Sequence, residues 1–268
     1  MARDIDQMRK TLIKRAKKQV QERYSETDVD IIRAISVLGD LDNAFNLLAE
    51  NAIEWYGGHF PELQSIIRDN EAYLKIIKEF GEKENISEKK LSKLLDETGK
   101  EKKIEEVSKS SMGSPVKKKA LEELQLLASN ALLLKTERKK LQEFIEKEME
   151  KLAPNFSKVA GGVLGARLMA NAGGLKQLAM MPASTMQLLG AEKALFRHLK
   201  NKKIKGPKYG FIYGHSFVKQ VPGKNKGKAA RSVASKLVLA ARADYFGNKQ
   251  DVSKEMIADL EKRVAKLK

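Results

Sequence analysis

The sequence contains no cysteine among its 268 residues. This absence excludes disulfide bonds, thiol nucleophiles and zinc sites built on cysteine thiolates. Long hydrophobic runs are missing too: the longest uncharged stretch, about residues 177–191, is interrupted by Pro182 and Gly190 and is too short to span a bilayer. The first residues, MARDIDQMRK, are charged and lack the apolar core of a signal peptide. We therefore expect a soluble intracellular protein.

Motifs of catalysis and metal binding are also missing. The histidines, His59, His198 and His215, show neither the HExxH arrangement nor another paired spacing of metal ligands. The segment GKNKGK resembles a phosphate-binding loop, but its glycine spacing is one residue short and Ala229 stands where Ser or Thr is required. GGVLGAR is a lone glycine cluster, more typical of tight helix packing than of a cofactor loop. We therefore predict no catalytic residue, no metal and no cofactor.

Acidic residues are almost absent from one stretch of the chain. Between Ala153 and Ala243 there are 17 Lys and Arg but a single acid, Glu192. The whole chain has 52 basic and 35 acidic residues, so the remainder holds 52 − 17 = 35 basic and 35 − 1 = 34 acidic groups. The net charge of +17 therefore comes almost entirely from this one region. A localised basic region predicts a polyanionic partner, either a nucleic acid or an anionic membrane surface.

Three stretches differ in their pattern of apolar residues. Residues 1–62 predict helices, ended by the glycines and proline of EWYGGHFPEL. Residues 63–152 predict a long antiparallel coiled-coil hairpin with a polar, lysine-rich tip. Residues 153–268 predict a compact, basic, helical domain with a C-terminal helix and at most a short strand hairpin at PKYGFIYGHSFV. The expected fold class is all-α. The two predicted seams are Leu63, Ile66, Asn70, Tyr73, Ile77 and Phe80, and Leu124, Leu127, Ala131, Leu134, Leu141, Ile145 and Leu152.

The predicted hairpin has two possible roles. An arm of about 30 residues is about 45 Å long at the rise of an α-helix. Two paired arms bury only one stripe each, unless another surface covers their remaining apolar positions. The hairpin is therefore either a spacer or a dimerisation arm.

Glu192 lies at the start of a predicted helix, in GAEKALFRHLK. The N-terminus of a helix presents free N–H groups and the positive end of the dipole, which favour phosphate. Glu192 either complements this dipole, or accepts a hydrogen bond from a base or a partner, or orients Lys193. The helix has an apolar face of Ala191, Ala194, Leu195 and Leu199, and a basic face of Lys193, Arg197 and Lys200.

Two lysine groups flank an aromatic segment downstream. Each phosphate that they neutralise steepens the salt dependence of binding by about 0.7–0.9 log units. The aromatic residues Tyr209, Tyr213 and His215 are candidates to stack on unpaired bases, and the two tyrosines are equally candidates for core residues with a polar tip. The two groups are Lys200, Lys202, Lys203, Lys205 and Lys208, and Lys224, Asn225, Lys226, Lys228 and Arg231.

Three segments carry a family resemblance: MPASTMQLLGAEKALFRHLK, GPKYGFIYGHSFV and KNKGKAARSVASKLVLAARADYF. They closely resemble the signature domain of the Nop family, the core proteins of box C/D ribonucleoproteins. The resemblance covers about residues 152–246 and extends more loosely upstream through DIIRAISVLGDLDNAFNLLAENAIEWYGGHFPEL and the hairpin. The intact GAEK motif and the lack of a long Lys/Glu/Asp repeat tail fit the archaeal form. The sequence begins at the helix that normally follows the N-terminal domain by which archaeal members bind fibrillarin.

The resemblance implies a scaffold protein. Its Nop domain recognises a kink-turn RNA already bound by a small ribosomal-type protein, and its coiled coil pairs with a second copy. Methyl transfer to the ribose 2′-hydroxyl, in rRNA or tRNA, belongs to fibrillarin, which uses S-adenosylmethionine. The location is the cytoplasm of an archaeal cell, or the nucleolus in a eukaryote. The alternatives are a spliceosomal-type kink-turn factor and a coiled-coil protein that meets RNA only by charge.

The basic segments and the resemblance together predict a surface that binds RNA and the ribonucleoprotein. By the family analogy, His215 lies near flipped-out or stacked bases and the lysines hold phosphates. The predicted residues are Gln187, Gly190, Ala191, Glu192, Lys193, Arg197, Lys200, Lys208, Tyr209, His215, Lys224, Asn225, Lys226, Lys228 and Arg231.

Overall fold

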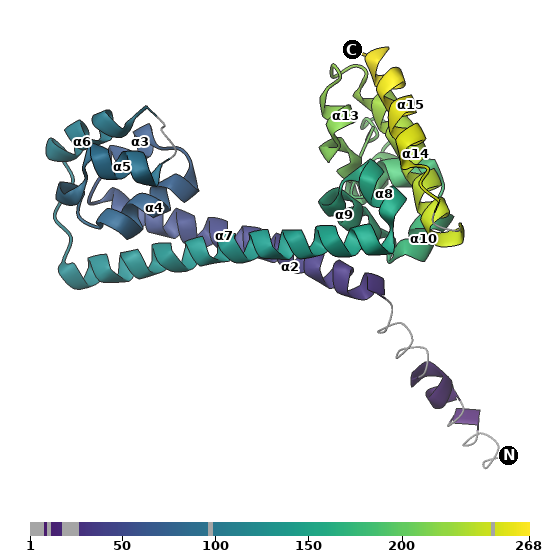
Figure 1. The fold of residues 1–268 in the computed structure, drawn as a ribbon, viewed down its shortest axis with the longest axis horizontal. Coiled ribbons are helices and arrows are strands. Elements are labelled where there is room, and N and C mark those ends of the chain that lie inside the picture. The colour runs from purple at the N-terminus through teal and green to yellow at the C-terminus, as the bar shows by residue number, and fades with distance from the viewer. Residues whose placement is uncertain (1–7, 10–11, 18–26, 96–98, 248–249) are drawn as a thin grey trace. The chain divides into compact units, whose positions relative to one another are not determined.

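The computed structural model describes residues 8–9, 12–17, 27–95, 99–247 and 250–268. Within these ranges every regular element is a helix, which confirms the all-α prediction (Figure 1). The segment PKYGFIYGHSFV forms helical turns rather than a short strand hairpin. No helix in the described ranges is long and apolar enough to cross a membrane.

The chain divides into two compact units. Unit 1 comprises residues 1–36 and 142–268, and unit 2 comprises residues 37–141. Two long helices, α2 (Thr27–Gly57) and α7 (Lys118–Leu152), contribute to both units.

Helices α2 and α7 run antiparallel in unit 2. Arg138 Nε donates to Asp42 Oδ1 at 2.5 Å, and Lys135 Nζ lies 4.5 Å from the ring centroid of Phe45. Phe45 is three residues beyond Asp42, whereas Lys135 is three residues before Arg138, so the helices advance in opposite directions. Small residues let helix axes approach closely. If this register continues along the two helices, Ala49 lies opposite Ala131 and Ala52 lies opposite Ala128. All four alanines are fully buried.

The first predicted hairpin arm, beginning at Leu63, is not one long helix. The seam residues that were expected there belong to short helices, and α2 is the helix that pairs with α7. Asp69 begins α4 by accepting a hydrogen bond from Ala72 N–H at 2.8 Å, and Gly81, with φ of 62°, ends it. The short helices are α3 (Leu63–Ile66), α4 (Asn70–Phe80), η1 (Lys83–Asn85), α5 (Glu88–Leu94) and α6 (Glu101–Lys109).

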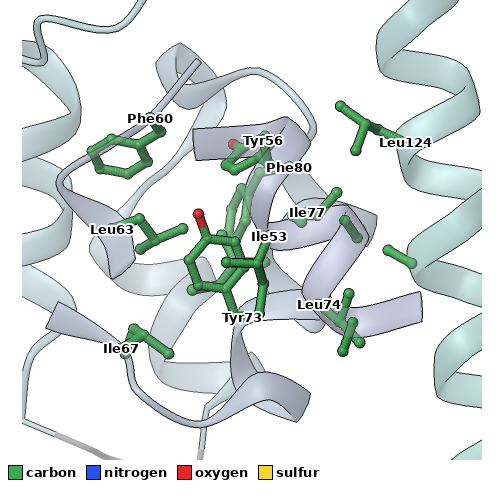
Figure 2. Close-up of a cluster of buried hydrophobic side chains, with 14 of the residues drawn as sticks. Ile53, Tyr56, Phe60, Leu63, Ile67, Tyr73, Leu74, Ile77, Phe80 and Leu124 are labelled. Atoms are coloured by element: carbon green, nitrogen blue, oxygen red, sulfur yellow. The ribbon is translucent and has the colours of Figure 1, made fainter. Parts of the chain in front are cut away.

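These short helices form a packed insert between α2 and α7 instead of a polar tip. Its core joins aromatic and aliphatic side chains of α2, α4 and α7 (Figure 2). Each large apolar side chain that is fully buried contributes about 1.5–3 kcal/mol. The core includes Ile53, Tyr56, Phe60, Leu63, Ile67, Tyr73, Leu74, Ile77, Phe80 and Leu124.

The beginning and the end of the insert are held together by hydrogen bonds. Ser114 N–H donates to Gly58 O at 3.0 Å. The ring of buried His59 bonds Ser114 O through Nδ1 at 2.9 Å and accepts Lys83 N–H at Nε2 at 3.0 Å. Lys83 Nζ donates to Gly113 O at 2.7 Å. The residues that follow α2 therefore lie directly beside those that precede α7.

Two buried tyrosines in this core differ in their hydroxyl groups. Tyr56 OH donates to Gly81 O at 2.7 Å, whereas Tyr73 OH has no hydrogen-bond partner in the described part of the chain. Burial raises the pKa of both, so both hydroxyls stay protonated at neutral pH. An unsatisfied buried hydroxyl costs about 1–3 kcal/mol.

We expect Tyr73→Phe to raise the free energy of unfolding by about 1 kcal/mol, because it removes the unsatisfied hydroxyl. Tyr56→Phe is the matched control, and it is expected to lower the free energy by about 1 kcal/mol because Gly81 O loses its donor. Denaturant unfolding measures both. A loss on Tyr73→Phe as large as that on Tyr56→Phe would contradict the assignment.

Unit 1 is built around α14 (Lys226–Phe246), which packs against α8, α10, α11, α13 and α15 (Figure 1). Alanines and valines on its buried faces let these helices approach closely. The other elements are α8 (Pro154–Ala160), α9 (Gly162–Ala172), α10 (Leu175–Met180), α11 (Ala183–Leu188), α12 (Glu192–Lys200), η2 (Phe211–Gly214), α13 (Ser216–Lys219) and α15 (Ser253–Ala265).

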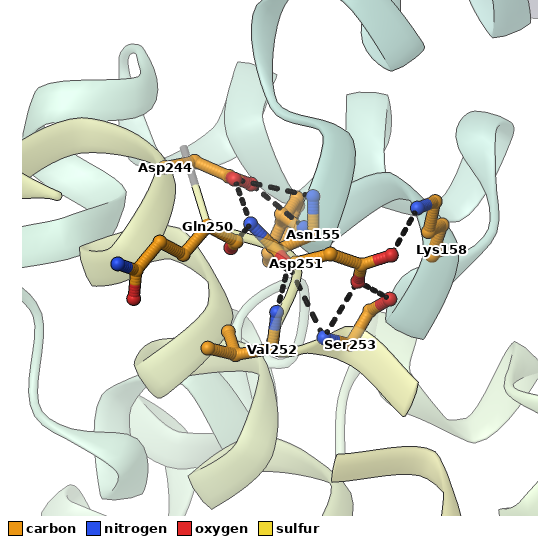
Figure 3. Close-up of polar contacts among 8 residues, drawn as sticks. Asn155, Lys158, Asp244, Gln250, Asp251, Val252 and Ser253 are labelled. Atoms are coloured by element: carbon orange, nitrogen blue, oxygen red, sulfur yellow. Dashed lines mark hydrogen bonds and ion pairs between the residues drawn. The ribbon is translucent and has the colours of Figure 1, made fainter. Parts of the chain in front are cut away.

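Two buried polar residues join three helices of unit 1 (Figure 3). The Asp244 carboxylate accepts the backbone N–H of Asn155 at 3.1 Å and of Phe156 at 2.7 Å, at the N-terminus of α8. It also accepts Asn155 Nδ2 at 2.7 Å. Asn155 Oδ1 in turn accepts N–H groups of Val252 and Ser253 at the start of α15. The end of α14 is thus fixed to the beginnings of α8 and α15.

Candidate nucleic-acid interface

The turn between α11 and α12 requires glycine at position 190. Gly190 has φ of 85°, and a Cβ there would lie 2.4 Å from ring carbons of Phe211. Glu192 Oε1 accepts the N–H of Gly190 at 2.6 Å. The only acid of the basic region therefore has a partner within the chain, where it fixes the start of α12.

The segment before η2 lies against α11. Gly210 N–H donates to Gln187 O at 3.0 Å, and Phe211 N–H donates to Leu189 O at 2.8 Å. Gln187 Nε2 donates to Lys208 O at 2.6 Å. These bonds fix the backbone of Lys208 beside α11.

A basic groove of about 440 Å³ lies where α11, Lys208 and the start of α14 meet. Four of its lining residues are cations and none is an acid. Such a groove attracts the phosphates of a nucleic acid. Its lining includes five residues predicted from sequence: Gln187, Lys208, Lys224, Lys228 and Arg231.

An apolar groove of about 270 Å³ lies on α11 and the beginning of α12. Ser184 and Leu188 line both this groove and the basic groove, so α11 is a wall of each. The apolar groove could not be predicted from the charge pattern, because Ser184, Thr185 and Leu188 are uncharged. The lining residues are Ser184, Thr185, Leu188, Leu189, Glu192 and Leu195.

Helix α12 buries none of its side chains. Phe196 is 61% exposed and Leu199 is 52% exposed. The predicted apolar face of this helix is therefore not packed into the interior of the domain. The predicted basic residues Lys193, Arg197 and Lys200 are exposed as well.

The predicted aromatic residue Tyr209 stacks on Tyr213, with ring centroids 5.1 Å apart and planes inclined by 19°. Lys226 Nζ lies 4.7 Å from the centroid of Tyr213 and 3.2 Å from its hydroxyl. Tyr213 is exposed, whereas Tyr209 and Lys226 are partly exposed, so the two rings and Lys226 form a cluster at the surface rather than part of the core. Aromatic faces beside cations suit unpaired bases.

The prediction that His215 stacks on bases is wrong for this structure, because the side chain is only 5% exposed. Phe217 N–H donates to Nδ1 at 3.2 Å, so Nδ1 is unprotonated and Nε2–H donates to Val159 O at 2.7 Å. His215 thus fixes the end of η2. Asn225 also has an internal partner, since its Nδ2 donates to Leu267 O at 2.7 Å.

The stability of the protein is expected to fall as the pH drops below about 6.5, because burial lowers the pKa of His215 against the opposing bond to Val159. The unfolded chain takes up the proton first. Neutral His215 therefore makes its full contribution to stability above the pKa that it has in the unfolded chain. That contribution is lost as the pH falls through the lower pKa that it has in the folded protein. Denaturant unfolding of the wild type and His215→Gln between about pH 7 and 5 measures this. If the free energy of unfolding depended on pH in the same way for the wild type and for His215→Gln, this prediction would be contradicted.

In the described part of the chain, no three histidine or carboxylate side chains lie close enough together to hold a metal ion.

A family model described as "Nop: snoRNA binding domain, fibrillarin" matches residues 37–266. An uncharacterized NOP5 family protein of Methanocaldococcus jannaschii is 41% identical, covering 94% of this chain and 60% of that protein. Nucleolar protein 58 of Lodderomyces elongisporus is 42% identical, and that of Saccharomyces cerevisiae is 41% identical; each covers 90% of this chain. This chain spans 47% and 48% of the lengths of these two fungal proteins.

A solved structure of a fibrillarin/Nop5p complex is similar over 97% of this chain and 78% of that chain, with 23% identity and a TM-score of 0.49. The sequence relationships are stronger. The family model covers all of unit 2 and residues 142–266 of unit 1, and the identities exceed 40% over most of the chain. This chain therefore belongs to the Nop family.

Proposed function

We propose that this protein is a scaffold of the box C/D guide ribonucleoprotein. It binds a kink-turn RNA together with a small kink-turn-binding protein, and it positions fibrillarin for 2′-O-methylation of RNA. One observation carries this proposal: the basic groove and the apolar groove share α11 as a wall. Two surfaces of different chemistry, side by side, suit an RNA and a protein that are recognised together.

In this proposal the basic groove binds the RNA of the RNA–protein complex. Lys208, Lys224, Lys228 and Arg231 present their charges to one concavity without an acid among its lining residues. Each phosphate bound there steepens the salt dependence by about 0.7–0.9 log units. The stacked pair of Tyr209 and Tyr213, of which Tyr213 is exposed and Tyr209 partly exposed, lies on the segment that follows Lys208, where an unpaired base can stack.

In the same proposal, helix α12 contacts the small kink-turn-binding protein. A helix that exposes Phe196 and Leu199 while burying no side chain offers apolar surface for a partner. The apolar groove continues this surface along α11. Lys193 and Arg197, on the same helix, bring basic charge to the junction between the protein and the RNA.

Fibrillarin is named in the description of the matching family and in that of the similar complex. We assign the chemistry of methyl transfer to that partner, and this chain contributes binding and position only. A second copy of this chain is the proposed partner of unit 2. Leu126 and Leu133 are 56% and 62% exposed and lie one heptad apart on α7. Sedimentation that shows only a monomer at working concentration would exclude this dimer.

Gel-shift titration tests the scaffold, using a box C/D kink-turn RNA with and without the kink-turn-binding protein at two salt concentrations. We expect tight binding only to the preformed complex. Lys193→Ala and Glu192→Ala are expected to weaken it about 10-fold, a typical loss for a central contact. Lys202→Ala, on an exposed turn, is the control and is expected to change it about 2-fold or less.

Equal losses from these three variants would contradict a special role for the start of α12. Binding that ignores RNA fold and partner, and fades with salt alone, would make the chain a charge-driven RNA binder. Glu192→Gln adds a sharper comparison, because its amide oxygen can still accept Gly190 N–H. If it binds like the wild type, Glu192 acts by fixing the turn. If it binds like Glu192→Ala, the carboxylate charge itself meets the partner.

A further inference from the structure

A second groove lined by cations lies in unit 2, between α4 and α7. Its volume is about 530 Å³. It contains none of the residues that the sequence patterns or the family resemblance single out for RNA binding. The lining residues of this α4–α7 groove are Glu71, Lys75, Leu132, Lys135, Thr136, Arg138 and Lys139.

Two of its cations are held in place by the helix pair. Arg138 Nε bonds Asp42 Oδ1 at 2.5 Å, and the Lys135 ammonium lies over the ring of Phe45 at 4.5 Å. Both side chains are only partly exposed. Because these contacts already restrict the side chains, a ligand that binds them pays little of the usual ordering entropy.

The charges of the groove do not balance. Two carboxylates pair with cations of the groove: Asp42 pairs with Arg138, and Glu71, the one acid in the lining, pairs with Lys75 at 3.0 Å. Among the described residues, Lys135 and Lys139 have no acid within ion-pair distance. They lie four residues apart on one face of α7, where like charges repel each other. An anion bound between them would relieve that repulsion.

We propose that the α4–α7 groove binds backbone phosphates of RNA, with Lys135 and Lys139 as the main contacts. The inference rests on the proposed function, because the occupant is a part of the guide RNA outside its kink-turn. A phosphodiester provides the missing negative charge, and Leu132 provides apolar surface for the adjoining ribose. The ammonium groups act as point charges, so the groove holds the backbone without reading the sequence.

The experiment uses the full chain and two RNAs, a minimal kink-turn RNA and a complete box C/D guide RNA that contains it. The variants are Lys139→Glu and the double variant Lys135→Glu/Lys139→Glu. Lys140→Glu is the matched control, since Lys140 is the next residue on α7 and lies outside the groove. Lys228→Glu reports on the basic groove of unit 1. Circular dichroism establishes that each variant is folded, and Lys139→Glu alone leaves the contact of Lys135 with Phe45 intact.

We expect the double variant to bind the guide RNA about 10-fold more weakly, with a salt dependence that is shallower by about 1–2 log units. Its binding to the minimal RNA stays within about 2-fold of wild type, and Lys140→Glu stays within about 2-fold on both RNAs. Wild-type binding of the guide RNA by the double variant would overturn the inference. Equal losses from Lys139→Glu and Lys140→Glu would do the same, because only overall charge would then matter.

A nucleoside triphosphate titrated into the wild type separates free nucleotide from RNA. One outcome would assign the groove to a free nucleotide and overturn our proposal. In that outcome the double variant no longer binds the nucleoside triphosphate, yet it binds the guide RNA as tightly as the wild type does. If the proposed scaffold function itself is wrong, the experiment gives a different result. In that case Lys228→Glu would bind both RNAs as tightly as the wild type, whatever the α4–α7 groove does.

Discussion

Asp244→Ala is expected to lower the free energy of unfolding of unit 1 by about 3 kcal/mol or more. The Asp244 side chain is buried, with 6% of the residue exposed, and its two oxygens accept three N–H groups at the start of α8 (Figure 3). Alanine leaves those donors buried without an acceptor and removes an anion from the positive end of a helix. Denaturant unfolding followed by circular dichroism measures the loss.

Asp251→Ala is the control for this prediction. Hydrogen bonds from Ser253 and Lys158 lower the pKa of Asp251 to about 2, but this carboxylate lies at the surface. Water replaces its partners, so we expect a much smaller loss than for Asp244→Ala. Similar losses from the two variants would show that the buried network does not hold the helices of unit 1 together.

Gly210→Ala is expected to abolish binding to the RNA–protein complex and to destabilise unit 1 by about 3 kcal/mol. A Cβ at this position would lie 1.9 Å from Leu189 O and 2.9 Å from Leu188 O. Backbone atoms cannot rotate away as a side chain does, so the segment must separate from α11. The bonds from Gly210 N–H and Phe211 N–H to α11 and the residue after it would then break, and Lys208 would leave the basic groove.

Gly214→Ala is the matched control, four residues further along the same segment. A Cβ at Gly214 meets no atom within 4 Å, and its φ is not in the left-handed region. We expect stability and binding to remain close to wild type. Gel shift and thermal unfolding of the two variants are compared. A normal affinity of Gly210→Ala would contradict the close packing of Lys208 and Gly210 against α11.

Much of the fold could be predicted from helical spacing, but the helix that pairs with α7 could not. Leu63, Tyr73 and Phe80 repeat at three and four residues, and this spacing is the same in a coiled-coil arm and in a short helix that packs into a core. The cap at Asp69 and the positive φ of Gly81 interrupt the pattern locally. Only tertiary packing decides that α2, rather than the residues after 63, lies beside α7.

The basic groove could be predicted because charge is visible in a sequence. Lys208, Lys224 and Arg231 come from separate segments, yet all belong to a region with a single acid. Burial is not visible in the same way. His215 looked available to a base, but its partner Val159 is 56 residues away and encloses it in the interior. The apolar groove combines α11 with the start of α12, and the spacing of apolar residues within one helix does not reveal which helix lies beside it.

The hydrogen bonds that join the two ends of the insert have a consequence for the order of folding. An antiparallel helix pair usually forms across a short turn, whereas α2 and α7 meet across the whole insert. Closing a loop about tenfold longer costs about 2 kcal/mol more in chain entropy. If the insert folds first, Ser114 is already beside Gly58 and that cost is met before α2 touches α7. The helix pair can then close outward from the buried alanines toward Asp42 and Arg138, so the insert acts as the folding nucleus of unit 2.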